Sequence, residues 1–275
     1  MAENKRFFYG WLILLTCILI MGLGYAPLVS CASLFTKPVT EDLGFTRSGY
    51  ALVSTIAALM MAFMSPFIGK IMSKPYMHKA LVVCMIGNCL AYYCYSFAST
   101  LPQFYVTAAC IGFFECGSTM IPVSVLITNW FRKKRGLVMS IAMVGSSIGG
   151  TILSPIIGNL IASQGWRFTY KAVGITRLVI LVPLVLLVIR RTPADMGTKA
   201  YGADEEGETG KARKTEREWN VSLKEVKKKP MFWCFVLGCT LISATAAVIT
   251  QIPASVMDAG YATTTAASIA SLYLF

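Results

Sequence analysis

The chain has 275 residues, of which 56% are hydrophobic and 14% are charged, so it has too few polar side chains to cover a soluble globule of this length. Its net charge of +12 invites a nucleic-acid partner, but the basic residues are spread over short segments between apolar stretches. The composition therefore indicates an all-α membrane protein that crosses the lipid bilayer several times.

Apolar segments of about 20 residues, the length that crosses a hydrocarbon core of about 30 Å, recur along the chain. Seven of them predict complete spans, and an eighth span begins near Thr264. The seven run from Tyr9 to Ser33, Gly49 to Ile71, Ala80 to Ala98, Phe104 to Asn129, Gly136 to Ser163, Phe168 to Ile189, and Met231 to Met257.

The first predicted span contains residues that disturb a helix. Gly22, Gly24 and Pro27 surround Tyr25, and they predict irregular backbone at this point. A kink that only assists packing and a role for Tyr25 in lining a substrate path both fit this pattern. An outer loop is predicted next, over residues 34–47.

Four consecutive cations separate the fourth and fifth spans. They are Arg132, Lys133, Lys134 and Arg135. Because Lys and Arg are retained in cytoplasmic loops, this turn predicts that both spans have their adjoining ends in the cytoplasm. With the N-terminus also inside, the cytoplasmic segments hold 20 of the 25 Lys and Arg residues and the outer loops hold 4. This distribution is typical of a cell-membrane protein and requires no nucleic-acid partner.

Two charged residues lie far from the ends of predicted spans, Glu115 in the fourth and Arg177 in the sixth. A charge at bilayer depth costs several kcal/mol unless it is paired or faces water. At 1.5 Å per residue, Glu115 is roughly 17 Å and Arg177 roughly 14 Å from the outer ends of their spans, so they can share a depth. Either they form a structural ion pair, or they act in transport, with Glu115 taking up and releasing a proton. Thr250 and Gln251 in the seventh span are candidates for the opposite wall of a path.

Small residues mark the fifth span as a packing surface. Gly145 and Gly149 are one helical turn apart, and Gly150 follows directly. Because glycine lets the backbone of a neighbouring helix approach closely, we expect another span to pack against this face.

The sequence has no arrangement that is typical of an enzyme. Its single histidine, His78, lies in a predicted cytoplasmic loop, and there is no Ser-His-Asp or Cys-His arrangement and no phosphate-binding loop. The nine cysteines lie in or beside apolar spans without the spacing of metal ligands. We therefore expect no enzymatic activity, no metal and no cofactor.

Three motifs lie at the ends of spans. They run from Phe35 to Arg47 after the first span, from Asn129 to Gly136 between the fourth and fifth, and from Arg191 to Gly197 after the sixth. At this spacing they resemble motifs of the major facilitator superfamily, in particular its oxalate/formate antiporter-like and monocarboxylate-transporter-like branch. The resemblance extends from about Tyr9 to the last residue. One departure is that Ser73 and Lys74 stand where the superfamily normally has Asp followed by Arg, so the usual cytoplasmic charge latch cannot form.

The resemblance implies a division of the chain into three parts. Residues 1–189 would form an N-terminal half of six helices, residues 190–230 a cytoplasmic linker, and residues 231–275 the incomplete start of a second half, with span seven and part of span eight. The last segment is too short to cross a bilayer as a helix, so a fragment or a truncated product is expected.

The resemblance also implies a function. A secondary transporter of this kind moves a small organic anion, a mono- or dicarboxylate, across the cytoplasmic membrane by alternating access. The coupled species would be a proton or a counter-substrate. The alternative is a membrane protein that does not transport, either a truncation product or an accessory subunit.

Overall fold

The computed structural model describes residues 8–198, 200–201, 226 and 228–274, and in these residues the chain is almost entirely helical. Within these described ranges, six helical segments are long and apolar enough to cross a membrane. They are Gly10–Leu43, Arg47–Met72, Met77–Phe97, Leu101–Trp130, Arg135–Gln164 and Trp166–Val188. These segments confirm the first six predicted spans, and only the C-terminal end of the first span differs by more than three residues.

The first span is a series of four helical pieces. They are α1 (Gly10–Leu19), the π-helix η1 (Ile20–Tyr25), α2 (Ala26–Val29) and α3 (Ala32–Leu43). The irregular backbone expected around Tyr25 is therefore a wide helical turn. π-Helical turns are rare in proteins, and many of those that occur lie at functional sites.

The predicted outer loop over residues 34–47 is wrong, because most of it is the helix α3. Phe35 is fully buried and stacks on Tyr170 with ring centroids 4.1 Å apart. The burial of this and neighbouring apolar side chains outweighs the hydrogen bond that Pro38 removes from the helix. The helix ends at Gly44, whose φ of 67° is left-handed and suits a residue without a Cβ.

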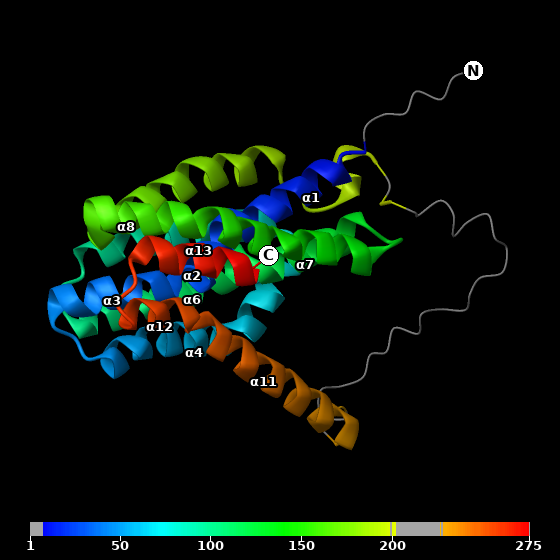
Figure 1. Cartoon of the computed structure of the whole chain (residues 1–275). Coiled ribbons are helices and arrows are strands. Elements are labelled where there is room, and N and C mark those ends of the chain that lie inside the picture. Colours follow the sequence, from blue (N-terminus) through cyan, green and yellow to red (C-terminus); the bar gives the residue numbers. More distant parts are fainter. Residues whose placement is uncertain (1–7, 199, 202–225, 227, 275) are drawn as a thin grey trace.

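The remaining spans form a bundle around this first one (Figure 1). In chain order the elements are α4 (Arg47–Met72), α5 (Met77–Cys94), η2 (Tyr95–Phe97), α6 (Leu101–Ser118), α7 (Met120–Trp130), α8 (Arg135–Val188) and η3 (Pro193–Met196). The fourth span consists of α6 and α7, which meet at Thr119. The fifth and sixth spans both belong to α8, which turns at Gly165.

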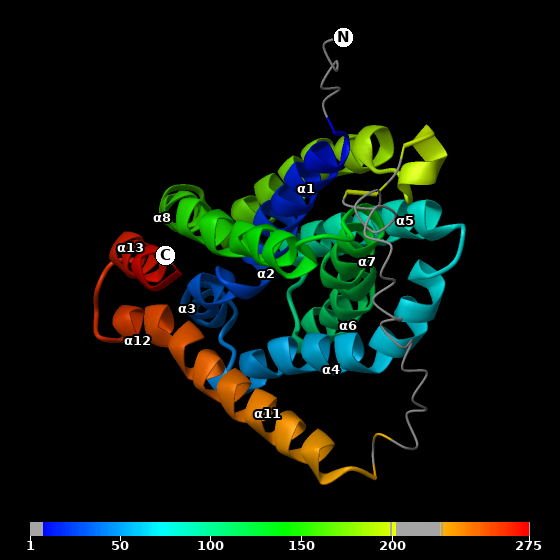
Figure 2. The ribbon, with the colours of Figure 1, turned by 90° about the vertical axis from the view of Figure 1, so that its right-hand side faces the viewer.

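The last described helices are α11 (Pro230–Thr250), α12 (Ile252–Asp258) and α13 (Thr263–Leu274). Figures 1 and 2 both show α11 running obliquely away from the bundle, while α13 lies beside α8. The predicted seventh span covers α11 and α12, and the predicted start of the eighth lies in α13. Lys37 Nζ donates to the Met257 carbonyl at 2.6 Å and so ties α3 to the end of α12.

Two clusters of buried apolar side chains fill the bundle. The cluster toward the basic turn includes Cys17, Met85 and Leu181, and the cluster toward the opposite end includes Phe104 and Tyr170. On α5, α6 and α8 the change from one cluster to the other falls near residues 88–91, 111–116 and 170–181. The level between the clusters is therefore where buried polar groups are expected.

The glycines of the fifth span lie against the first span. A Cβ on Gly149 would be 2.3 Å from the carbonyl oxygen of Gly22, and a Cβ on Gly145 would be 2.5 Å from that of Ile18. Gly150 is buried in the same helix. The first and fifth spans therefore approach to a distance that an added methyl group does not permit.

Replacing Gly149 with alanine should destabilise the bundle. The new methyl group would overlap main-chain atoms, which cannot rotate away as a side chain can, and overpacking of this kind costs about 1–3 kcal/mol. The melting temperature of the purified protein in detergent is the measurement. Gly136→Ala is the matched control, since a Cβ there has no atom within 4 Å. Equal melting temperatures for the two variants would contradict the close contact.

Candidate functional site

The level between the two apolar clusters holds several buried polar side chains, and three of them come from three different spans. They are Asn88 of α5, Glu115 of α6 and Arg177 of α8, with exposed fractions of 0%, 4% and 2%. The structure therefore brings the two predicted intramembrane charges to the same depth. It adds an amide that the sequence analysis did not single out.

Both carboxylate oxygens of Glu115 accept hydrogen bonds. Asn88 Nδ2 donates to Oε2 at 2.6 Å, and Thr119 Oγ1 donates to Oε1 at 3.1 Å. Thr119 also donates to the Glu115 carbonyl at 3.0 Å. The carboxylate is thus held at the point where the fourth span is interrupted between α6 and α7.

Arg177 is bound by groups of the first and third spans. Its Nη2 donates to Asn88 Oδ1 and, at 2.8 Å, to the Gly24 carbonyl in η1. Its guanidinium carbon lies 5.0 Å from the ring centroid of Tyr92, which is close enough for a cation–π contact. The two charges consequently meet through the amide of Asn88 and not in a direct ion pair.

The same network lies beside two irregular stretches of backbone. Gly24 belongs to the π-helix of the first span, and Thr119 interrupts the fourth span with φ −123° and ψ −96°. A Cβ on Gly24 would lie 3.5 Å from the methyl group of Thr119, so these stretches are in contact. Non-helical backbone at membrane depth is tolerated where protein groups satisfy it, and here Arg177 does so for Gly24.

The other predicted path residues lie at different places. Tyr25 is half-buried at the end of η1, next to Gly24 and within electrostatic reach of Glu115. Gln251 is exposed at the junction of α11 and α12, and within the described ranges no hydrogen bond joins it to Tyr25, Glu115 or Arg177. The backbone of Thr250 ends α11, but its side chain lies outside the described part of the structure.

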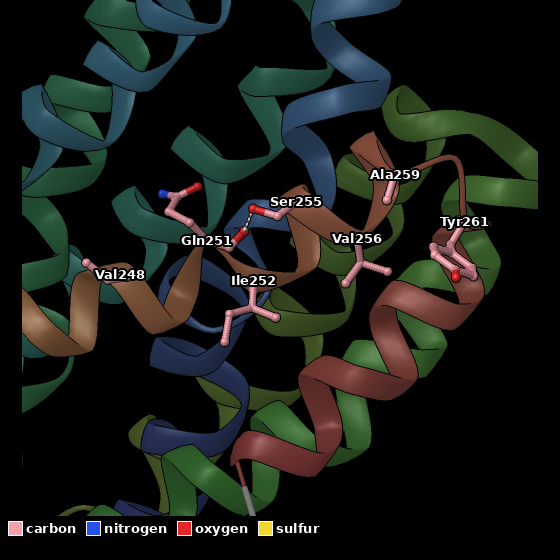
Figure 3. Close-up of a pocket in the computed structure, with 7 residues that line it drawn as sticks. All are labelled: Val248, Gln251, Ile252, Ser255, Val256, Ala259 and Tyr261. Carbon is pink, nitrogen blue, oxygen red and sulfur yellow. Dashed lines mark hydrogen bonds between the residues drawn. The ribbon is translucent and has the colours of Figure 1, made fainter.

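Gln251 instead borders an open hollow of about 500 Å³ on the surface of α11 and α12 (Figure 3). Figure 3 shows its amide pointing away from Ile252 and Val256, which form the apolar part of the wall. Its carbonyl accepts a hydrogen bond from Ser255 Oγ at 3.3 Å. The hollow and the buried network are therefore separate features of the described structure.

The basic turn is anchored by the segment that follows the sixth span. The main-chain amides of Arg132 and Lys133 donate to the Tyr201 carbonyl at 3.1 and 3.2 Å, and the Tyr201 amide donates to the Trp130 carbonyl at 3.0 Å. Lys134 adopts a left-handed conformation with φ 59°, and Arg135 Nε donates to the Phe131 carbonyl at 2.9 Å. The turn is thus fixed by its main chain.

Hydrogen bonds join the segment after the sixth span to the ends of the second and fourth spans. Arg191 Nη2 donates to the Ser73 carbonyl at 3.0 Å, and Trp130 Nε1 donates to the Arg190 carbonyl at 2.9 Å. The main-chain oxygen of Ser73 therefore accepts a hydrogen bond from an arginine side chain at this end of the bundle. Most of the predicted linker, residues 202–225 and 227, lies outside the described residues.

Asn88 is the functional candidate that the sequence analysis missed. Its signal was an amide in the middle of the apolar third span, far from either end. Because an amide carries no formal charge, Asn88 does not stand out in the sequence as Glu115 and Arg177 do. For metals, no group of three or more His, Cys, Asp or Glu side chains in the described residues is placed to hold an ion.

Comparisons with known proteins identify the family. The model of the Major Facilitator Superfamily matches residues 12–275. The chain belongs to the major facilitator superfamily. The resemblance seen in its motifs is thereby confirmed, and so is the fold: an all-α membrane protein with the N-terminal half of that architecture. The members it matches are transporters and not enzymes.

Several superfamily members are similar in sequence. The chain is 24% identical to human monocarboxylate transporter 2 over 229 residues, which are 82% of this chain and 45% of that protein. It is 26% identical to chicken monocarboxylate transporter 4 over 170 residues, 60% of this chain and 35% of that protein. It is 27% identical to the MFS-type transporter pynF of Aspergillus niger over 192 residues, 67% and 43% of the two chains. The chain thus spans less than half the length of these relatives.

A solved structure shares the fold. It is a bacterial homologue of the human lysosomal transporter Spinster in an inward-facing, unoccupied conformation, with a TM-score of 0.77 and 16% sequence identity. The match covers 99% of this chain and 60% of that one. The same homologue in an inward-facing, occupied conformation gives a TM-score of 0.74. The helical arrangement of this superfamily member therefore includes nearly the whole of the present chain.

Replacing Arg177 with leucine should strongly destabilise the protein. The change leaves Asn88 and the charge of Glu115 buried without their cationic partner, and breaking a buried charged network costs about 3–5 kcal/mol. Arg167→Leu is the control, since Arg167 pairs with Asp42 at 3.2 Å on an exposed surface, where such pairs contribute about 1 kcal/mol or less. Thermal unfolding in detergent measures both, and a melting temperature for Arg177→Leu no lower than that of Arg167→Leu would refute the central role of Arg177.

Proposed function

We propose that this chain is a secondary transporter that moves a small organic anion, a mono- or dicarboxylate, across the cytoplasmic membrane by alternating access. Residues 1–189 form the six-helix half, residues 190–230 the linker, and residues 231–275 the start of the other half. The N-terminus and the turn from Arg132 to Arg135 are cytoplasmic. The observation that carries this proposal is the superfamily match over residues 12–275, since alternating access between two halves is how such folds work.

The substrate class rests on the relatives. Proteins named as monocarboxylate transporters are similar to 60–82% of the chain, which favours a small carboxylate as the transported anion. The chemistry of the buried network agrees with an anion. With Glu115 ionised and Arg177 positive, the network has no net charge; when Glu115 binds a proton, the charge of Arg177 is left without compensation.

A proton can then be coupled to the anion. At about 10 Å and an effective dielectric constant of about 20, one uncompensated charge attracts an anion by about 1–2 kcal/mol. Tyr25, beside the network, contributes to the lining of the path. Proton symport is thus the favoured mode, and exchange for a counter-substrate uses the same site without net proton movement.

Proteoliposomes containing this chain alone should take up a labelled small monocarboxylate such as lactate, and an inward proton gradient should accelerate the uptake several-fold. Glu115→Gln should abolish the acceleration, because its amide cannot take up the proton. Glu41→Gln is the matched control, since the Glu41 side chain is 67% exposed in α3.

Absence of uptake by the wild-type chain would favour the alternative, a membrane protein that does not transport. Uptake that requires a second polypeptide would show that this chain is one part of a split transporter. Equal acceleration in Glu115→Gln and the wild type would refute Glu115 as the coupling group while leaving anion transport intact.

A further inference from the structure

Asn88 joins two groups that have opposite hydrogen-bonding capacities. A guanidinium only donates hydrogen bonds, and an ionised carboxylate only accepts them. The amide offers one group of each kind: Nδ2 donates to Glu115, and Oδ1 accepts from Arg177. The chemistry of the partners therefore fixes the orientation of the amide, which is fully buried.

The amide stands in a continuous chain of hydrogen bonds through four spans. The chain runs from Thr119 to Glu115, from there to Asn88 and Arg177, and ends at the Gly24 carbonyl in the first span. A direct ion pair would join only the fourth and sixth spans. The amide extends the connection to the third span and leaves the guanidinium in contact with the π-helix of the first.

We infer that Asn88 is the positioning residue through which the protonation state of Glu115 acts on Arg177 and on the π-helix of the first span. The inference rests on the proposed proton-coupled transport and names the device that performs the coupling. When a proton from water binds a carboxylate oxygen of Glu115, the bond from Asn88 Nδ2 loses its charge assistance. Charge-assisted hydrogen bonds are about twice as strong as neutral ones, so the amide is then held mainly by Arg177.

The surroundings of Glu115 contain few other groups that titrate. Those within electrostatic reach are Tyr25 of η1, Cys89 of α5, Cys116 of α6 and Arg177 of α8. The sequence of α7 contains no titratable residue, and Arg47, Tyr50 and Lys70 of α4 lie toward the ends of that helix. Arg177 is therefore the one formal charge near the carboxylate in the described structure, and Asn88 is the side chain between them.

Infrared difference spectroscopy of the purified chain measures the protonation of Glu115 directly and does not depend on transport. The carboxylic acid band that is lost in Glu115→Gln reports the protonation of Glu115. In Asn88→Asp, a second carboxylate next to Glu115 opposes its ionisation and competes for Arg177, so the midpoint of the titration should move to higher pH by about one unit or more, a tenfold change in proton affinity. Asn88→Ala, which removes one donor to the carboxylate, should move it in the same direction by less.

The control is Asn159→Asp, the same chemical change at an exposed position of α8, and its midpoint should equal that of the wild type. An unchanged midpoint in folded Asn88→Asp or Asn88→Ala would overturn the inference. A wild-type chain that titrates as expected but takes up no anion would instead contradict the proposed function.

The connection from Arg177 to the π-helix of the first span can be measured separately, by hydrogen exchange. The protection of the η1 peptide against hydrogen exchange, corrected for the intrinsic pH dependence of amide exchange, should change with pH in the wild type, because Arg177 binds the Gly24 carbonyl. In Asn88→Ala that pH dependence should disappear while the protein remains folded. A pH dependence that persists in Asn88→Ala would show that protonation reaches the first span by another route, and the inference would fail.

Discussion

The positive charge of Arg177 lies between two apolar clusters, and contacts from several spans offset the cost of placing it there. The third span supplies Asn88 and the ring of Tyr92, and the first supplies the Gly24 carbonyl. The fourth supplies the carboxylate that balances the charge through Asn88. Because these partners come from segments far apart in the sequence, the charge is stable only when the whole bundle is assembled. The network thus fixes the relative depth of four spans.

Close packing and the network act on opposite sides of the first span. Gly145 and Gly149 bring the fifth span against the backbone at Ile18 and Gly22, while Arg177 binds the next turn at Gly24. A helix with wide π-type hydrogen bonding at this point is thereby supported on one face by main-chain contact and on another by a charged donor. These contacts explain how a membrane helix retains irregular backbone far from water.

The sequence was sufficient to predict features that depend on composition over many residues. Six spans, the basic turn and the shared depth of Glu115 and Arg177 follow from apolar length, charge distribution and the rise of a helix. Features that depend on one tertiary partner were not predictable. Residues 34–43 look like a polar loop in the sequence, but they are helical because Phe35 packs against Tyr170. The role of Asn88 appears only when its two charged neighbours are placed on either side of it.

The π-helix of the first span sets the direction in which the later side chains of that span point around its axis. A π-helical turn accommodates one residue more than an α-helical turn, and one residue corresponds to about 100° of rotation about the axis. The buried face of α1 at Cys17 and that of α3 at Phe35 therefore belong to two differently phased stripes on the same span. Removing a single residue from Ile20–Tyr25 would rotate α3 about its axis and turn Phe35 away from Tyr170, although no side chain of α3 would change. The length of this short segment, more than its composition, thus determines which face of α3 is buried.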